Sequence, residues 1–165
     1  MNRTKRIRHT KNNYTPNRRH HKNKKNKSSK KYTKTINNSK KSKIVTFFLE
    51  MLNVIKLYHW KTKSYAQHKA TDELYTKLNA NIDSFIEILL GKTGSRIDLM
   101  SKNSIRLVDL SSQESLKREI ESFKSYLVGL NDNKAMKKMS NTDLFNIRDT
   151  ILGDMNQFLY LLTFK

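Results

Sequence analysis

Apolar residues recur at intervals of three and four positions in four segments that follow residue 43. This spacing is typical of amphipathic α-helices, because it places the apolar side chains on one face. No segment has the alternating pattern of a β-strand, so we expect an all-α protein with four helices. The expected core residues are Ile44, Phe48, Met51, Ile55 and Tyr58 in the first helix, Ala70, Leu74, Leu78, Ile82, Phe85 and Leu89 in the second, Leu116, Ile120, Phe123, Leu127 and Leu130 in the third, and Leu144, Ile147, Ile151, Met155, Phe158 and Leu162 in the fourth.

Capping residues predict where the helices begin and end. The first helix covers roughly residues 43–60. Ser64, followed three residues later by Gln67, has the form of a capping box that opens the second helix, and Gly91 is expected to end it. The third and fourth helices have start signals at Ser111 with Glu114 and at Ser140, Asn141 and Asp143.

The lengths of the connections predict how the helices are arranged. The link between the first two helices, residues 61–64, is so short that these helices must be antiparallel neighbours. The link between the second and third helices, residues 92–110, is longer than a plain loop in a compact domain, and six large apolar residues between Ile97 and Val108 are expected to hold it on the surface. A long crossover of this kind, between two parallel helices, predicts a ferritin-like four-helix bundle.

Charge divides the chain at residue 43. Residues 1–43 carry 17 Lys and Arg and no Asp or Glu, whereas residues 44–165 carry 17 basic and 14 acidic residues. Because the first segment has few apolar residues to bury, we expect residues 1–43 to form a disordered basic tail and residues 44–165 to form the helical domain. The chain has no cysteine, and no signal peptide or membrane span is indicated. We therefore expect an intracellular protein without a membrane partner, in the cytoplasm, the nucleoid or the nucleus.

The basic tail predicts a sequence-neutral interaction with the phosphates of nucleic acid. No recognition helix or zinc finger is present to distinguish bases, and the sequence leaves open whether the partner is DNA or RNA. A solubilising or targeting function is the alternative for the tail. The expected contacts are Arg3, Lys5, Arg6, Arg8, Arg18, Arg19, Lys22, Lys24, Lys25, Lys27, Lys30 and Lys31.

Two pairs of residues on the second helix have the spacing of metal ligands. His68 and Asp72 are four residues apart, as are Asp83 and Glu87, so each pair shares a helix face. Asp72 and Asp83 are separated by about 16 Å along one helix, whereas the ligands of one ion lie about 2 Å from it. One chain therefore cannot close the site. With His59 at the end of the first helix, five groups become candidate ligands.

The spacing also predicts how a second chain would complete the site. His68 and Glu87 have the same midpoint along the chain as Asp72 and Asp83. Two antiparallel copies of this helix, related by a two-fold axis, would therefore place His68 opposite Glu87 and Asp72 opposite Asp83. We expect a metal site shared between the subunits of a dimer, with no catalytic residue separate from the metal ligands.

The segment from residue 57 to residue 91 resembles the ferroxidase segment of the Dps proteins, the DNA-binding mini-ferritins of bacteria. Members of that family have a His-Trp pair at the end of the first helix, His-x3-Asp on the second and, eleven residues after this Asp, Asp-x3-Glu. Here these positions are filled by His59, Trp60, His68, Asp72, Asp83 and Glu87. The segment is also similar to an uncharacterised ferritin-like group of large DNA viruses, which would place the protein in a virion.

The resemblance implies an iron site with His59, His68 and Asp72 from one subunit and Asp83 and Glu87 from the other. It further implies that Fe(II) is oxidised by peroxide or oxygen, that iron is stored in a twelve-subunit shell, and that Trp60 packs beside the site. Zinc and manganese are the alternative metals, because both accept imidazole and carboxylate ligands. The alternative function is that of a nucleic-acid condensing or packaging protein without enzyme activity, built on the same scaffold.

Overall fold

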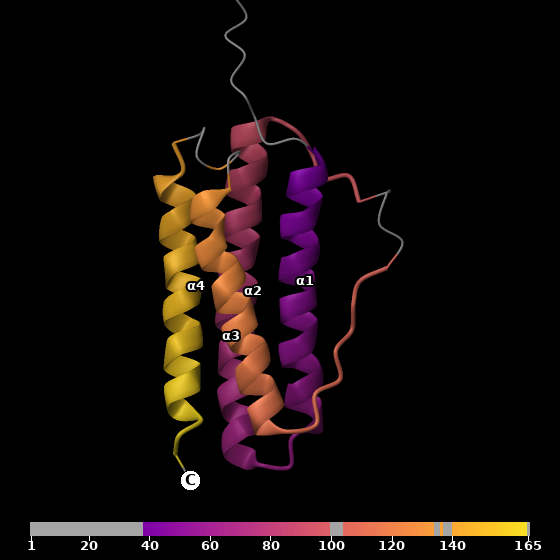
Figure 1. The fold of residues 1–165 in the computed structure, drawn as a ribbon, viewed down its shortest axis with the longest axis vertical. Coiled ribbons are helices and arrows are strands. Elements are labelled where there is room, and N and C mark those ends of the chain that lie inside the picture. The colour runs from indigo at the N-terminus through magenta and orange to yellow at the C-terminus, as the bar shows by residue number, and fades with distance from the viewer. Residues whose placement is uncertain (1–37, 100–103, 134–135, 137–139, 165) are drawn as a thin grey trace, which may run out of the picture. The chain divides into compact units, whose positions relative to one another are not determined.

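The computed structural model describes residues 38–99, 104–133, 136 and 140–164, and all of these are in its second compact unit, residues 33–165. Within them the chain forms four α-helices and one short 3₁₀ helix and has no strand, which confirms the all-α prediction (Figure 1). The helices are α1 (Asn38–Lys61), α2 (Tyr65–Thr93), α3 (Gln113–Gly129) and α4 (Thr142–Leu161), and the 3₁₀ helix η1 (Leu130–Asp132) follows α3 directly.

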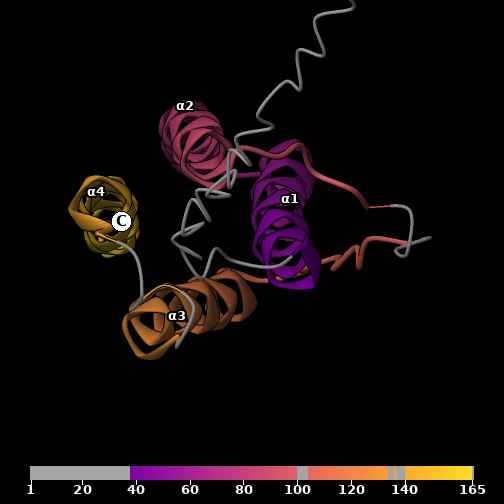
Figure 2. The ribbon, with the colours of Figure 1, turned by 90° about the horizontal axis from the view of Figure 1, so that it is seen from above.

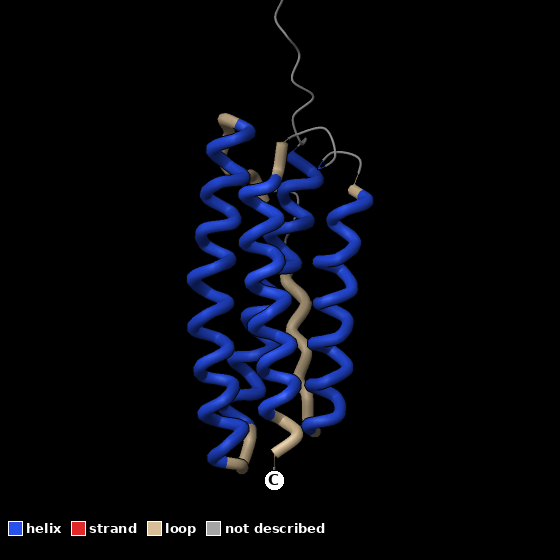
Figure 3. The backbone as a smooth tube through the Cα atoms, turned by 90° about the vertical axis from the view of Figure 1, so that its left-hand side faces the viewer, coloured by secondary structure: helices blue, strands red, loops and turns tan. Residues whose placement is uncertain are grey.

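The four helices form a bundle in which α2 packs against α1 on one side and α4 on the other, while α3 packs against α4 (Figure 2). In Figure 1, α1 and α4 run downward and α2 and α3 run upward. The connection between α2 and α3 therefore leaves one end of the bundle and meets α3 at the opposite end. Figure 3 shows most of this connection as loop lying beside the helices.

The core follows the predicted apolar faces closely. All the expected residues of α1 and of the segment from α3 to Leu130 are buried, and only Ala70 in α2 and Ile147 in α4 remain half-buried among the others. Phe48 and Phe85 meet edge to face in the centre of the bundle, with ring centroids 5.2 Å apart. This packing fixes which face of α2 points inward and, in consequence, which face is left for other contacts.

α1 begins five residues earlier than the periodicity predicts, so residues 38–43 belong to the helix and not to the tail. The cause is contact with the segment after α2. Asn38 donates a side-chain hydrogen bond to the carbonyl oxygen of Asp98 at 3.0 Å, and Ser42 donates to the same oxygen at 2.8 Å. Lys41 is buried and donates to Ser95. Apolar periodicity carries no signal for such polar contacts.

Two helix ends differ from the predictions by one turn or less. α2 continues past Gly91 and ends at Gly94, whose φ of 61° is the left-handed conformation that glycine adopts at low cost. α3 is capped by Ser112 with Ser115, not by Ser111 with Glu114. The predicted cap Ser64 does accept a hydrogen bond from the backbone N–H of Gln67, and α4 begins after Asn141.

Ion pairs hold the described parts of the connection on α1 and α3. Arg106 lies 2.9 Å from Glu119 of α3 and 4.0 Å from Glu50 of α1, and its backbone N–H donates to Glu50. Lys61 at the end of α1 pairs with Asp109 at 2.7 Å. Apolar contact contributes less than the sequence predicts, since Ile105 and Leu107 are exposed.

None of the helices in the described ranges has the length and apolar character needed to cross a membrane. The twelve basic residues expected to bind nucleic acid, Arg3 to Lys31, lie outside the described residues.

Candidate metal centre

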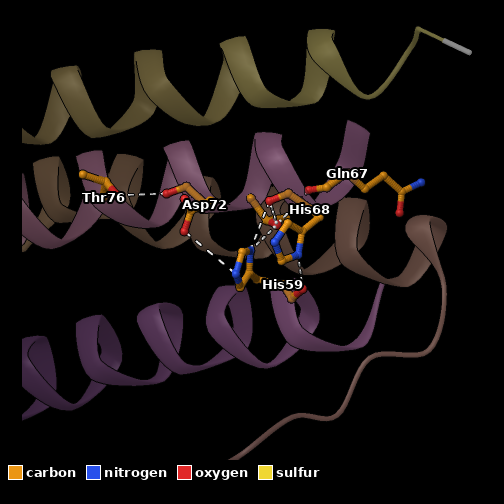
Figure 4. A network of polar contacts seen from close by, with 6 residues as sticks. His59, Gln67, His68, Asp72 and Thr76 are labelled. Atoms are coloured by element: carbon orange, nitrogen blue, oxygen red, sulfur yellow. Dashed lines mark hydrogen bonds and ion pairs between the residues drawn. The ribbon is translucent and has the colours of Figure 1, made fainter. Parts of the chain in front are cut away.

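His59 and His68 meet where α1 ends and α2 begins (Figure 4). The three-residue link 62–64 returns the chain immediately, so the last turn of α1 faces the first turn of α2. The two imidazole rings are stacked, with centroids 3.9 Å apart and an interplanar angle of 24°. His59 is buried at 7% exposure, whereas His68 is exposed. We call these two residues the imidazole pair.

Reciprocal hydrogen bonds orient both rings of the imidazole pair. Nδ1 of His59 lies 3.1 Å from the carbonyl oxygen of His68, and Nδ1 of His68 lies 3.1 Å from the carbonyl oxygen of His59. A carbonyl oxygen only accepts, so each Nδ1 carries the hydrogen and donates it. In a neutral ring the lone pair is then on Nε2. Metal-binding histidines are generally held this way, with one ring nitrogen on a backbone acceptor and the other available to the ion.

The hydroxyl group of Thr71 makes a further contact that orients the ring of His59. Its hydroxyl oxygen lies 3.3 Å from Nδ1 of His59 and donates a hydrogen bond to the carbonyl oxygen of Gln67 at 2.7 Å. Thr71 is fully buried beside the apolar core. Thr71 is not among the predicted site residues, and its position three residues after His68 on the inward side of α2 is the signal that could have indicated it.

Asp72 adds a carboxylate to the imidazole pair. Its Oδ1 lies 3.9 Å from Nε2 of His59, and its side chain is 51% exposed. Figure 4 shows the Asp72 carboxylate on α2 pointing toward the His59 ring on α1. The structure therefore brings together three of the five predicted ligands, from two helices, at an edge of the bundle that is open to solvent.

The other two predicted ligands lie farther along α2. Asp83 and Glu87 are exposed, and neither has a hydrogen bond or ion pair with any described residue. The described residues contain no group of three or more His, Asp or Glu side chains close enough to hold one ion. The donor set of imidazole and carboxylate groups suits Fe(II), Fe(III), Zn(II) and Mn(II), but one protomer supplies only part of a coordination shell.

The side chain of Gln67 links α2 to the end of α1 and to the start of α3. Its side-chain carbonyl accepts hydrogen bonds from the hydroxyl of Tyr58 at 2.7 Å and from Thr62 at 3.0 Å, while its amide donates to Gln113 of α3 at 2.7 Å. Burial raises the pKa of Tyr58 above its ordinary value, and the Tyr58 hydroxyl is the donor because the amide carbonyl of Gln67 can only accept. Tyr58 and Thr62, which precede and follow His59 in the chain, are therefore both bonded to Gln67 of α2.

Trp60, which is expected to pack beside the site, is 68% exposed in the protomer. The ammonium group of Lys56 lies 5.7 Å from the centre of the Trp60 ring and 4.6 Å from that of Tyr75 on α2. A cation over two aromatic faces is an attractive arrangement. It joins α1 to α2 on the same open edge as Asp72.

Comparison with known proteins places the chain in a family. Residues 59–162 match the model of a family of unknown function, DUF5856, and the chain belongs to this family. The matched region begins at His59 and includes all five predicted ligands. No curated protein and no solved structure matches the chain.

Proposed function

We propose that the protein is a Dps-like mini-ferritin that oxidises and sequesters Fe(II) at sites shared between subunits and binds nucleic acid through its basic tail. The observation that supports this most strongly is the arrangement of His59, His68 and Asp72. Two imidazoles with Nδ1 on backbone carbonyls direct their metal-binding nitrogens away from those bonds, and a carboxylate lies 3.9 Å from one of them.

A second subunit would supply the missing ligands. Asp83 and Glu87 are exposed and without partners in the described residues, and α2 is an unbroken helix from residue 65 to residue 93. In a two-fold antiparallel contact between two α2 helices, Asp83 and Glu87 of one protomer would face Asp72 and His68 of the other. The order of ligands along α2 is therefore compatible with two equivalent sites per dimer.

The chain topology supports a ferritin-like bundle. α2 and α3 run in the same direction, and the connection between them spans the length of the bundle (Figure 1). Ferritin-like bundles have one such long connection.

The chemistry of the proposed reaction requires two iron ions. Reduction of one H₂O₂ to two H₂O takes two electrons and two protons, and each Fe(II) that becomes Fe(III) supplies one electron. Carboxylate and imidazole ligands bind iron in both states. A site that holds both ions avoids the one-electron reduction of peroxide that releases hydroxyl radical.

The first experiment measures oxidation of Fe(II) by the purified protein. Fe(II) is added without oxygen, H₂O₂ follows at one equivalent per two Fe(II), and ferric absorbance is recorded. The double variant His68→Ala/Asp72→Asn should react at least about tenfold more slowly, because it lacks two ligands of each site. Glu73→Gln is the matched control, since Glu73 pairs with Lys77 at 2.8 Å and is not a predicted ligand. Equal rates for the wild type and the double variant would overturn the proposed reaction.

A mixing experiment tests whether the site is shared. The variants His68→Ala/Asp72→Asn and Asp83→Asn/Glu87→Gln should each be inactive alone. A mixed dimer restores one site, because the intact halves meet in one of its two positions. Random mixing should therefore recover about a quarter of the wild-type rate. No recovery, with mixed dimers shown by mass spectrometry, would exclude a shared site. A protein that binds nucleic acid but never oxidises iron would favour the condensing function.

A further inference from the structure

On one flank of α2, the side chains of four residues are exposed in the described part of the chain. On the opposite flank α4 covers α2, where Asn81 donates to Asp154 at 3.0 Å and Lys77 donates to Gln157 at 3.0 Å. The described parts of the connection are held on α1 and α3 by Arg106 and Lys61. We call the exposed residues His68, Asp72, Asp83 and Glu87 on the first flank the α2 stripe.

The α2 stripe contains three carboxylates, and none of them has an ion pair with a lysine or arginine among the described residues. Asp83 and Glu87 have no ion pair with a described residue, and the nearest cation to Asp72 is His59 at 3.9 Å, which is charged only when protonated. Basic groups near the stripe include Arg96, which lines the same hollow as Glu87, and Lys56, which lies over the rings of Trp60 and Tyr75. The four side chains of the stripe itself, three carboxylates and one imidazole, carry more negative than positive charge.

A two-fold contact between two copies doubles this imbalance. The shared midpoint of the ligand pairs puts Asp72 of one protomer opposite Asp83 of its partner, and the reverse pair is formed at the same time. Two like charges brought together in a partly dehydrated contact repel each other. A divalent cation between them reverses the sign of the interaction, because each carboxylate then faces a positive charge.

The neighbouring surface supplies contact area for a second copy. Leu52 on α1 and Tyr75 and Ile86 on α2 are half-buried in the protomer and pack against the core from the side. Buried His59 contributes an Nε2 atom whose nearest charged partner is Asp72. A second copy of this chain fits this surface, because it presents the same apolar residues and places its own Asp83 and Glu87 opposite Asp72 and His68.

We propose that binding of a divalent metal ion controls association of the subunits, so that the metal-free protein resists dimerisation and the metal-loaded protein is a dimer. This inference rests on the proposed shared site and goes beyond it by making assembly depend on the ion. Each ion would contact groups from both protomers, and its binding energy would appear as subunit affinity.

Sedimentation equilibrium of the full-length protein tests the inference without any measurement of iron oxidation. One sample contains EDTA, and the other contains Mn(II), which does not oxidise under these conditions. The dimer dissociation constant should be at least about tenfold lower with Mn(II). The variant Asp72→Asn/Asp83→Asn should dimerise more tightly than the wild type in EDTA and should no longer respond to Mn(II), since the repulsion and the ligands are removed together.

The matched control is Glu73→Gln/Glu121→Gln, which removes two carboxylates that are not part of the stripe and that pair with Lys77 and Lys124. It should behave as the wild type does. Equal dissociation constants with EDTA and with Mn(II), together with activity in the mixing experiment, would overturn metal control and leave the shared site intact. Mn(II) bound tightly by a protein that remains monomeric would overturn both. Weaker dimerisation of Asp72→Asn/Asp83→Asn in EDTA would also overturn the repulsion on which the inference depends.

Discussion

Nδ1 of His59 and Nδ1 of His68 each lie 3.1 Å from the backbone carbonyl oxygen of the other residue. The two bonds cross between the last turn of α1 and the first turn of α2. They join the ends of two helices through one buried ring, that of His59, and one exposed ring, that of His68.

This relationship predicts the tautomer of both rings. Because each Nδ1 donates to a carbonyl, the neutral rings of His59 and His68 should carry hydrogen on Nδ1, which leaves Nε2 as the lone-pair nitrogen. Long-range ¹H–¹⁵N correlation spectra at alkaline pH distinguish the two nitrogens, and the variants His59→Ala and His68→Ala assign the signals. Hydrogen on Nε2 in both rings would contradict the reciprocal bonds.

The end of α2 predicts opposite effects for two glycines. Gly94→Ala should lower the free energy of unfolding by about 1 kcal/mol, because an alanine is strained at the φ of 61° observed there. Gly91→Ala should raise it by about 0.5–1 kcal/mol, since Gly91 is inside the helix and an added Cβ meets no atom within 4 Å. Urea denaturation measures both values. The reverse order would place the helix end at Gly91.

Arg106 should keep the connection closed against α1 and α3. Its guanidinium lies between Glu50 and Glu119, whose side chains are only 20% and 19% exposed. Arg106→Gln removes both ion pairs but keeps the backbone hydrogen bond to Glu50, and it should lower the free energy of unfolding by up to about 1 kcal/mol. Amide hydrogen exchange of residues 105–108 should become faster. Arg118→Gln, an exposed residue of α3, is the control and should change neither quantity.

Asp143 predicts a small dependence of stability on pH. Burial acts to raise its pKa, but hydrogen bonds from Lys92 and from the backbone N–H of Leu144 outweigh this effect and lower the pKa below its ordinary value. A lowered pKa means that the contribution is present above the ordinary pKa and is lost as the pH falls through the folded value. Asp143→Asn should therefore cost at most about 0.5 kcal/mol at pH 7, because the side chain is 46% exposed.

The measurement for Asp143 is urea denaturation of the wild type and the variant at pH 7 and near pH 3. The difference between them should shrink at the lower pH. In a Lys92→Met background, Asp143→Asn should cost less at pH 7. A difference that grows on acidification would contradict the sign of the pKa shift.

The basic tail predicts binding to nucleic acid that weakens steeply with salt. A protein that starts at Asn38 lacks 14 Lys and Arg, and it should bind a duplex at least about 100-fold more weakly at low salt. The slope of the logarithm of the binding constant against that of the salt concentration should also approach zero. Fluorescence anisotropy with DNA and RNA duplexes measures both quantities. Equal slopes for the two proteins would show that the tail does not contact phosphates.

The sequence predicted the parts of the fold that depend on apolar periodicity. The inward faces of all four helices followed from residues such as Phe48 and Leu78, because burial is set by spacing along a helix. The start of α1 did not follow, since it depends on polar contacts from Ser42 to a carbonyl more than fifty residues away. Long-range bonds of this type are not encoded in any local pattern.

For the candidate site, the sequence also predicted the positions of residues along the helices but not their side-chain contacts. The spacing of His68 and Asp72 identified a shared helix face, and the short link brought His59 to it. The reciprocal bonds of the imidazole pair and the position of Thr71 depend on the side-chain geometry at the meeting of two helices. For the same reason the exposure of Trp60 was not predictable, because a His-Trp pair in sequence does not determine on which side of α1 the indole lies.

The length of α1 separates the start of the helical domain at Asn38 from the imidazole pair. The chain enters the helical domain at Asn38, about 32 Å along the helix axis from His59. A fluorophore or affinity tag attached immediately before Asn38 therefore joins the domain at the end remote from both histidines. Labelling there allows the intact domain to be followed by spectroscopy while the imidazole pair keeps its native surroundings.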